Sequence, residues 1–335
     1  MFTMKTLHLR GLSGLFLTLI WAALPAAHAA APKGFTAEKT EHGATIKFNG
    51  APLAEYVIDQ ANKPYLFPVH GPTGKAMTRA FPMQVVAGEQ HDHPHHRGIN
   101  FGHQDIGGFD SWSERASFGA KTNAATNPAF ARLGAIQHRA FKELSGDAHQ
   151  AVLVTENDYV NHDGKKLFSE LRRLTFRAEG DTRIIDFDQE FTATEGPLVF
   201  GDQKDAGLSI RVPTSMAVDT KKGGHIITSA GLTDGDAWGK RAKWVDYHGP
   251  VAGETLGVAM LNHPSSFRHP TSWHVRTYGL FTANPFGTLD KADPNGPHTL
   301  PQGEKLRLRH RFILHTGDEQ VAKIAEAYER YAAEK

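Results

Sequence analysis

From Phe35 to about Thr316, short runs of alternating hydrophobic and polar residues are separated by turn residues, a pattern typical of half-buried β-strands. Along residues 183–192, Ile185, Phe187 and Phe191 fall on one face together with Gln189, and the other face is mainly acidic. Residues 306–314 alternate in a similar way between apolar and basic side chains. Such strands suit an antiparallel sheet with one face in the core and one face in water.

Turn residues divide this pattern into hairpins. Asn49-Gly50 separates the predicted strands 43–48 and 53–58, and 162–164 separates 151–159 from 166–178. Further strands are expected at 99–103, 208–212, 256–261 and 275–283. This many short strands, with no long linker or internal repeat, predicts an all-β fold, a single large antiparallel β-sandwich domain.

Residues 318–333 form the one segment with helical spacing. Its apolar stripe consists of Val321, Ile324, Ala325, Tyr328 and Tyr331. We expect this C-terminal helix to cover an edge or end of a sheet.

The first 29 residues have the features of a signal peptide. Lys5 and Arg10 precede an apolar stretch at 12–24, and Ala27-His28-Ala29 is typical of a cleavage site. We therefore expect a periplasmic or secreted protein whose single domain spans residues 30–335. No apolar run near 20 residues follows, so no membrane span is expected after cleavage.

The charge is balanced, with 37 basic and 36 acidic side chains and 20 histidines. This balance provides no electrostatic basis for binding nucleic acid. The chain has no cysteine, so a bound metal would be held by histidine and carboxylate side chains. We expect a small-molecule or oligosaccharide substrate as the partner.

Five of the histidines lie within residues 91–103, and this histidine loop is the strongest functional signal in the chain. Pro94 disfavours a central strand, so we expect a loop or edge that leads into strand 99–103. Imidazole is both a near-neutral acid/base group and the commonest metal ligand. The acid/base candidates here are His96 and His103, with Arg97 and Trp112 as substrate-binding residues. The alternative metal ligands are His93, His95, His96 and His103.

Two further loops carry candidate chemistry. In 201–207, Lys204 is placed to stabilise a developing negative charge. In 261–274, His263 is a candidate acid, and Trp273 and His274 are candidate ligand contacts. We expect all three loops to line one cleft.

These motifs resemble a bacterial exported family of unknown function that is commonly labelled "methane oxygenase PmoA". The resemblance rests on 91–98 with 101–103, on 204–208, on 262–264 with 269–274, and on 284–287. A methane monooxygenase subunit spans the membrane, and this chain lacks the apolar runs for that after cleavage. The resemblance implies a galactose-mutarotase-like β-sandwich, or supersandwich, that binds sugars on a sheet.

Three hypotheses remain open from the sequence. The first is a periplasmic carbohydrate-active enzyme that performs epimerisation, elimination or hydrolysis by acid/base chemistry. The second is a metal-dependent enzyme that holds one divalent ion in the histidine loop. The third is a non-catalytic sugar-binding protein.

Overall fold

The computed structural model describes residues 1–3, 33–119, 122–123 and 125–335. It divides into two units, Met1–Ala31 and Pro32–Lys335, and the predicted signal peptide lies outside the described residues except for 1–3. Among the described residues, no helix is long and apolar enough to cross a membrane. The features below all belong to the second unit.

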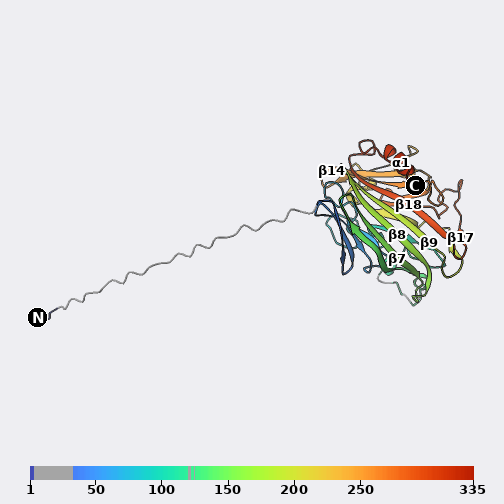
Figure 1. Ribbon diagram of the computed structural model, residues 1–335, viewed down its shortest axis with the longest axis horizontal. Helices are drawn as coiled ribbons and strands as arrows, with labels where there is room; N and C mark the ends of the chain where they lie inside the picture. The colour runs from blue at the N-terminus through green and yellow to red at the C-terminus, as the bar shows by residue number, and fades with distance from the viewer. Residues whose placement is uncertain (4–32, 120–121, 124) are drawn as a thin grey trace. The chain divides into compact units, whose positions relative to one another are not determined.

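The described strands form two eight-stranded antiparallel sheets and a two-stranded one (Figure 1). In order, the first sheet contains β1 (Phe35–Thr40), β2 (Gly43–Phe48), β3 (Ala51–Val57), β4 (Tyr65–Val69), β5 (Ile99–His103), β11 (Ala206–Arg211), β16 (Leu280–Asn284) and β15 (Ser272–Val275). The second contains β12 (His225–Thr228), β13 (Trp244–Val251), β14 (Glu254–Asn262), β18 (Lys305–Thr316), β9 (Thr182–Thr192), β8 (Lys166–Glu179), β7 (Gln150–Val160) and β6 (Ala135–Gly146). The short sheet pairs β10 (Leu198–Phe200) with β17 (His298–Leu300). Short 3-10 helices lie in the connections: η1 (Arg115–Phe118), η2 (Phe130–Arg132), η3 (Thr214–Met216), η4 (Val218–Thr220) and η5 (Asp234–Ala237).

The hydrophobic core lies between the two large sheets. Phe101 of β5 and Phe191 of β9 are both fully buried, and their ring centroids are 5.1 Å apart. Burying one such ring contributes roughly 1.5–3 kcal/mol. The predicted inner face of β9 is confirmed, because Ile185, Phe187 and Gln189 are buried with Phe191. The predicted all-β antiparallel sandwich is therefore confirmed.

The hairpin between β2 and β3 is confirmed, and its turn explains the Asn-Gly pair. Asn49 and Gly50 have φ of 51° and 78°, the left-handed backbone that a tight hairpin turn requires.

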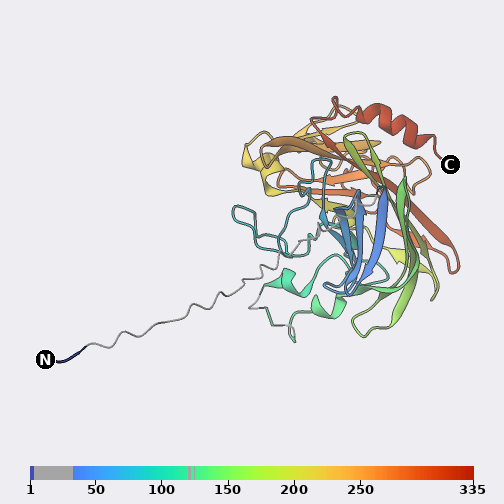
Figure 2. The same cartoon turned by 60° about the vertical axis from the view of Figure 1, so that its left-hand side comes forward.

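The C-terminal helix is confirmed, but α1 spans Ile324–Ala332 and does not begin at Asp318. The Asp318 carboxylate accepts hydrogen bonds from the backbone N–H groups of Gln320 and Val321, which makes this segment a turn. Tyr328 and other apolar residues of α1 pack against β13, β14 and β18 on the outer face of the second sheet. Figure 2 shows α1, in red, beside these strands.

The prediction of one strand over 275–283 was wrong. The chain ends β15 at Val275, reverses, and begins β16 at Leu280. The Arg276 N–H donates to the Leu280 carbonyl oxygen at 2.7 Å, and Gly279 has a φ of 103° that favours glycine. The reversal places Arg276 and Tyr278 in a turn at the end of the first sheet.

Candidate active site

A row of polar side chains crosses the outer face of the first sheet. Phe101 of β5 faces the core, so Asn100 faces outward by the two-residue period of a strand. Strand register then aligns Asn100 with Ser209 of β11, Ser209 with Thr282 of β16, and Thr282 with His274 of β15. We call Asn100, Ser209, Thr282 and His274 the polar row. All four are buried.

One member of the polar row lacks a hydrogen-bond partner. The Ser209 hydroxyl donates to the Asn100 carbonyl oxygen at 3.2 Å, and the Asn100 amide donates to the Arg97 carbonyl oxygen at 2.9 Å. The Thr282 Oγ1 is buried and bonds to no other described residue. Leaving such a group unpaired costs roughly 1–3 kcal/mol. This cost fits a position at which a bound ligand supplies the missing partner.

The histidine loop and the Trp112 segment stand beside this row. A Cβ on Gly102 would lie 2.9 Å from the Trp112 Cα, so the Trp112 segment passes directly over the outer face of β5. The Trp112 ring lies 5.7 Å from that of His96 and 6.2 Å from that of His95. His93 stacks on His96, with ring centroids 4.8 Å apart and the two planes almost parallel. Three imidazoles and an indole therefore form one cluster above the sheet.

Asp92 anchors the histidine loop to the sheet. Its carboxylate accepts a hydrogen bond from Arg211 Nη2 at 2.9 Å and pairs with the guanidinium of Arg79. Burial alone would raise the pKa of Asp92. A hydrogen bond from His93 and the charges of both arginines outweigh this effect, so the pKa of Asp92 lies well below its usual value. Both arginine side chains are almost fully buried. The loop is thus held by an ionised network in which two buried guanidinium groups pair with a partly exposed carboxylate.

The partners of His96 and His274 fix their tautomers. Arg211 Nη1 lies 3.2 Å from His96 Nδ1, and a guanidinium only donates, so Nδ1 accepts and the proton sits on Nε2. His274 Nδ1 lies 2.8 Å from the Lys204 carbonyl oxygen, which only accepts. His274 therefore carries its proton on Nδ1 and has a lone pair on Nε2. The two imidazoles present opposite groups, an N–H donor and an acceptor nitrogen.

Both imidazoles are neutral at neutral pH. Burial lowers the pKa of His96 well below its usual range, and the nearby charges of His95 and Arg211 lower it further. Burial likewise lowers the pKa of His274 to about 4, although Asp205 opposes this shift. The Asp205 carboxylate lies 3.6 Å from His274 Nδ1, where it can stabilise a positive charge that forms on that ring.

A chain of aromatic and cationic side chains links His96 to His274. The Arg211 guanidinium lies 4.7 Å from the Tyr278 ring centroid, and that of Arg276 lies 5.5 Å from the same ring. Arg276 also lies 5.9 Å from the Trp238 ring, which lies 6.4 Å from the ring of His274. Trp238 and Arg276 also line a hollow of about 290 Å³. We call Arg211, Tyr278, Arg276 and Trp238 the rim.

Two predicted site residues face the core instead. His103 is fully buried on the inner face of β5, with its ring 5.0 Å from that of Phe286, and burial lowers its pKa to about 3. Trp273 is also fully buried, and its indole N–H donates to the Ala242 carbonyl oxygen at 2.9 Å. Neither side chain lies on the face that carries the polar row.

His263 and Lys204 do not join the polar row through their side chains. His263 lies at the end of β14, where its Nε2 is 2.9 Å from the Glu334 carbonyl oxygen and its ring is 4.9 Å from that of Tyr331. It therefore lies beside α1, on the second sheet. The Lys204 side chain is exposed and pairs with Asp205 at 2.7 Å, so only the Lys204 backbone contributes to the site. Residues of all three loops therefore contribute to the site through His96, the Lys204 carbonyl oxygen and His274, but the side chains of His263 and Lys204 do not.

Arg97 holds the Trp112 segment in place. Its guanidinium forms a two-pronged pair with the Glu114 carboxylate, with both shorter contacts at 2.8 Å. The buried Lys63 ammonium lies 3.5 Å from the same carboxylate and donates to the Trp112 carbonyl oxygen at 2.7 Å. Arg97 is thus occupied within the protein, and Trp112 is positioned by the groups around it.

The geometry does not bring the four predicted metal ligands together. His93, His95 and His96 lie above the outer face of the first sheet, and His103 lies on its inner face. Among the described residues, one set of histidine and carboxylate side chains has metal-ligand spacing, and it consists of Asp246, His248 and Glu319 on the second sheet.

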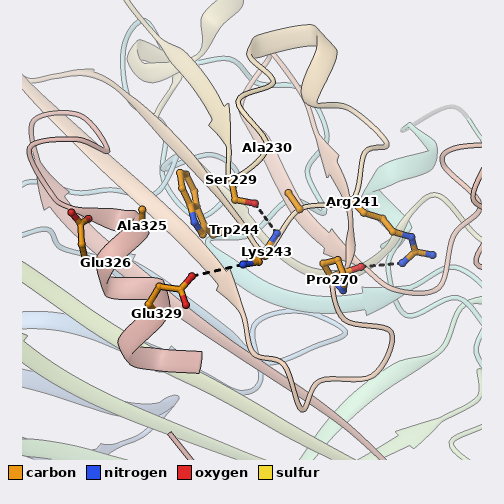
Figure 3. Close-up of a pocket in the computed structure, with 10 residues that line it drawn as sticks. Ser229, Ala230, Arg241, Lys243, Trp244, Pro270, Ala325, Glu326 and Glu329 are labelled. Atoms are coloured by element: carbon orange, nitrogen blue, oxygen red, sulfur yellow. Dashed lines mark hydrogen bonds and ion pairs between the residues drawn. The ribbon is translucent and has the colours of Figure 1, made fainter. Parts of the chain in front are cut away.

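Two larger cavities lie outside the polar row. One of about 850 Å³ borders the histidine-loop anchor, because Thr78, Ala80 and Glu89 line it while Arg79 turns to Asp92. The other, about 640 Å³, lies beside α1 (Figure 3). There Lys243 faces Glu329 at 3.7 Å, and Arg241 donates to the Pro270 carbonyl oxygen at 3.0 Å. The residues that line the cavity beside α1 include a surface ion pair but no histidine, so this cavity lacks the acid/base groups found near the polar row.

Residues 43–329 match a family described only as one of unknown function. The chain belongs to DUF6807. No curated protein matches this DUF6807 member, and no comparison supports the methane oxygenase label.

Several solved structures are similar to the DUF6807 chain at low identity. The α-galactosidase from Lactobacillus brevis has a TM-score of 0.39 and 11% identity over 90% of this chain, which spans 43% of that protein. A galactose mutarotase related enzyme from Lactobacillus acidophilus has a TM-score of 0.34 and 8% identity, covering 85% of this chain and 98% of that one. A galactose mutarotase-like protein from Lactobacillus casei has a TM-score of 0.38 and 8% identity, covering 84% and 100%.

Proposed function

We propose that this DUF6807 protein is a carbohydrate-active enzyme that moves a proton on a sugar bound at the polar row. The observation that carries the proposal is the opposite tautomers of His96 and His274, fixed by Arg211 and by the Lys204 carbonyl oxygen. One ring offers a hydrogen-bond donor and the other a lone pair, and both are neutral. This combination suits removal of a proton next to an oxygen that becomes negative.

In this mechanism His274 is the general base and His96 is the electrophile. His274 Nε2 accepts the proton, and Asp205, 3.6 Å from Nδ1, stabilises the imidazolium that forms. The His96 Nε2–H donates to the developing negative oxygen, and Arg211 supplies positive charge behind the ring. His274 can return the proton only to the face from which it removed it, so epimerisation additionally requires a proton donor such as water on the opposite face; departure of a substituent after the first proton transfer gives elimination. Hydrolysis additionally requires a water molecule that His274 activates.

The other groups at the site suit a polyhydroxylated ring. Trp112, Tyr278 and Trp238 supply aromatic faces. Tyrosine and tryptophan offer a large apolar surface for contact with a sugar ring and also carry an O–H or N–H group that can form a hydrogen bond. The unpaired Thr282 hydroxyl and the Asn100 amide supply short-range polar contacts along the sheet. A few placed polar groups among apolar walls are typical of small-molecule sites.

The same rim also suits a sugar-binding protein without turnover, and that alternative differs in one outcome of the test below. The metal-dependent alternative has less support, because among the residues that the structure describes no set with metal-ligand spacing lies in the histidine loop. We further propose that the protein is exported, with cleavage after Ala29, because Lys5, Arg10 and the apolar stretch precede that site. Mass spectrometry of the secreted or periplasmic chain tests this directly.

Turnover is best tested by proton NMR of a panel of mono- and oligosaccharides incubated with mature protein in D2O. We expect wild type and the exposed control His149→Gln to exchange or convert one sugar class. We expect His274→Gln and His96→Gln to lose about 10²–10⁴-fold in rate.

Three outcomes would contradict the proposal. Unchanged turnover in His274→Gln would show that His274 is not the general base. Saturable binding to wild type without any exchange would establish the sugar-binding alternative. Loss of activity on chelation, restored by a divalent ion, would favour the metal-dependent alternative.

A further inference from the structure

A second cluster of histidine and carboxylate side chains lies on the outer face of the second sheet. Val245 and Tyr247 of β13 face the core, so Asp246 and His248 face outward on the same side of the strand. Glu319 reaches them from the turn that follows β18. One ligand atom from each of Asp246, His248 and Glu319 lies within 4.8 Å of the other two.

The spacing of these atoms fits a small divalent ion. His248 Nδ1 lies 2.7 Å from Asp246 Oδ1 and 3.8 Å from Glu319 Oε2. Ligand atoms about 2.0–2.2 Å from a tetrahedral zinc ion lie roughly 3.4 Å from each other. These two separations lie on either side of the required one, and the third, between Asp246 and Glu319, is within 4.8 Å.

The cluster contains more negative charge than one neutral imidazole can satisfy. Asp246 is fully buried and Glu319 is partly buried, and a neutral His248 has at most one N–H on Nδ1 to offer the two carboxylates. Two carboxylates this close repel each other unless a cation lies between them. A proton on His248 or a divalent ion would fill that role, and the ion would use the Nδ1 lone pair directly.

A fourth residue orients the buried carboxylate. His315 of β18 lies 2.7 Å from Asp246 through its Nε2, although β14 separates β18 from β13. The imidazole crosses β14 above Gly257, where a Cβ would lie 2.2 Å from His315 Cε1. Glycine inside a strand weakens it and often marks such a close approach. An N–H donated to the distal oxygen of a ligating carboxylate is the usual support around a metal site.

We propose that Asp246, His248 and Glu319 bind one divalent transition-metal ion of the zinc class, with His315 positioning Asp246. One imidazole and two carboxylates suit Zn²⁺ better than Mg²⁺ or Ca²⁺, which prefer oxygen ligands alone. Three protein ligands leave a coordination position for water. His225 lies beside the cluster, with its ring 5.4 Å from that of His248 and its Nδ1 3.0 Å from Asp234. This site is independent of the sugar chemistry proposed above.

The test is isothermal titration of Zn²⁺ into tag-free, chelator-treated mature protein at pH 7.5. The histidine loop could also take up zinc, so the titration is repeated in His93→Gln/His95→Gln. We expect one stoichiometric site in wild type, in the loop variant and in the control Glu326→Gln, which changes an exposed acid on α1. We expect at least a 10-fold weaker affinity in His248→Gln and in Glu319→Gln, and a 10–100-fold weaker one in His315→Gln.

Glu319→Gln changes a partly buried turn residue, so its melting temperature verifies that the variant is folded. Unchanged affinity in both His248→Gln and Glu319→Gln would overturn the proposal. Loss of the site in the loop variant, or no saturable binding in wild type, would do the same.

Discussion

The outer faces of the two large sheets carry histidines in opposite electrostatic settings. On the first sheet, His96 and His274 are flanked by an arginine donor and a backbone carbonyl oxygen, and their pKa values are lowered. On the second sheet, burial also lowers the pKa of His248, but Asp246 and Glu319 raise it to above its usual value. The difference shows that the partners, and not burial alone, decide the direction in which the pKa of a buried imidazole shifts.

This difference also separates the chemistry that each face can support. A neutral imidazole with a free lone pair suits proton transfer, and an imidazole among carboxylates suits cation binding. The following predictions test that separation, beginning with the largest effect.

Replacing His274 or His248 with glutamine, one at a time, separates the effect on catalysis from the effect on cation binding. We expect His274→Gln to lower turnover of a confirmed sugar substrate about 10²–10⁴-fold, because the acceptor nitrogen is lost. We expect His248→Gln to leave kcat within about 3-fold, because His248 lies on the other sheet. Steady-state kinetics on both variants measure this. Equal losses in the two variants would contradict the separation.

Removing the Asp246 charge tests the acidic cluster. Asp246→Asn removes the buried negative charge and leaves one amide oxygen where His248 and His315 each face a carboxylate oxygen, and we expect about 3–5 kcal/mol lower stability in metal-free protein. Asp290→Asn is the matched control, since solvent screens the Lys240–Asp290 pair and its loss should change stability little. Urea unfolding at pH 7.5 measures both. A loss below about 1 kcal/mol in Asp246→Asn would argue against a shared buried charge.

Acid should destabilise the fold through its neutral buried histidines. Burial lowers the pKa of His103 and His310 to about 3, below the unfolded value of about 6.5, so the unfolded chain binds more protons in between. Each group then removes about 1.4 kcal/mol of stability per pH unit as the pH falls from 6.5 towards 3. His248, whose pKa is raised, acts in the opposite sense, and its contribution is lost as pH rises through the folded pKa.

Urea midpoints between pH 4.5 and 7.5 measure this slope, and His310→Asn is the comparison. We expect the variant to be less stable at pH 7.5 and to show a shallower slope by about one proton. Stability that is flat between pH 6.5 and 4.5 would show that these rings are not held neutral.

The smallest effect is expected for Lys204→Ala. Its side chain is exposed and pairs only with Asp205 among the described residues, and its backbone carbonyl oxygen holds His274. We expect turnover within about 3-fold of wild type and less than about 1 kcal/mol change in stability. A larger loss of kcat would show that the Lys204 ammonium takes part in catalysis, as the sequence predicted.

The two-residue period of the sequence predicted most of the strands. The same period also indicates which face of a strand each side chain lies on, and grouping residues by loop motif ignored this. Phe101 and His103 share a face by parity, so His103 belongs with the core, and Trp273 and His274 must face opposite sides. Tyr278 and Arg276 were missed because 275–283 reads as one apolar strand, although Gly279 marks the reversal.

The remaining site residues depend on pairing between distant segments. Arg211 lies in a strand of buried residues, and only the contact with Asp92 reveals its role. Asp246 and His248 alternate along β13 without any cluster in sequence, and Glu319 reaches them from the end of β18. Strand register sets such contacts, and a single sequence does not specify which strands become neighbours.

The central claim is that His96 and His274 carry opposite tautomers. Long-range proton–nitrogen NMR of ¹⁵N-histidine-labelled mature protein at pH 7.5 measures it directly, with His96→Gln and His274→Gln to assign the two rings. The account predicts a protonated Nε2 in His96, a protonated Nδ1 in His274, and neutral rings in both. The same tautomer in the two rings, or a protonated imidazolium in either, would contradict it.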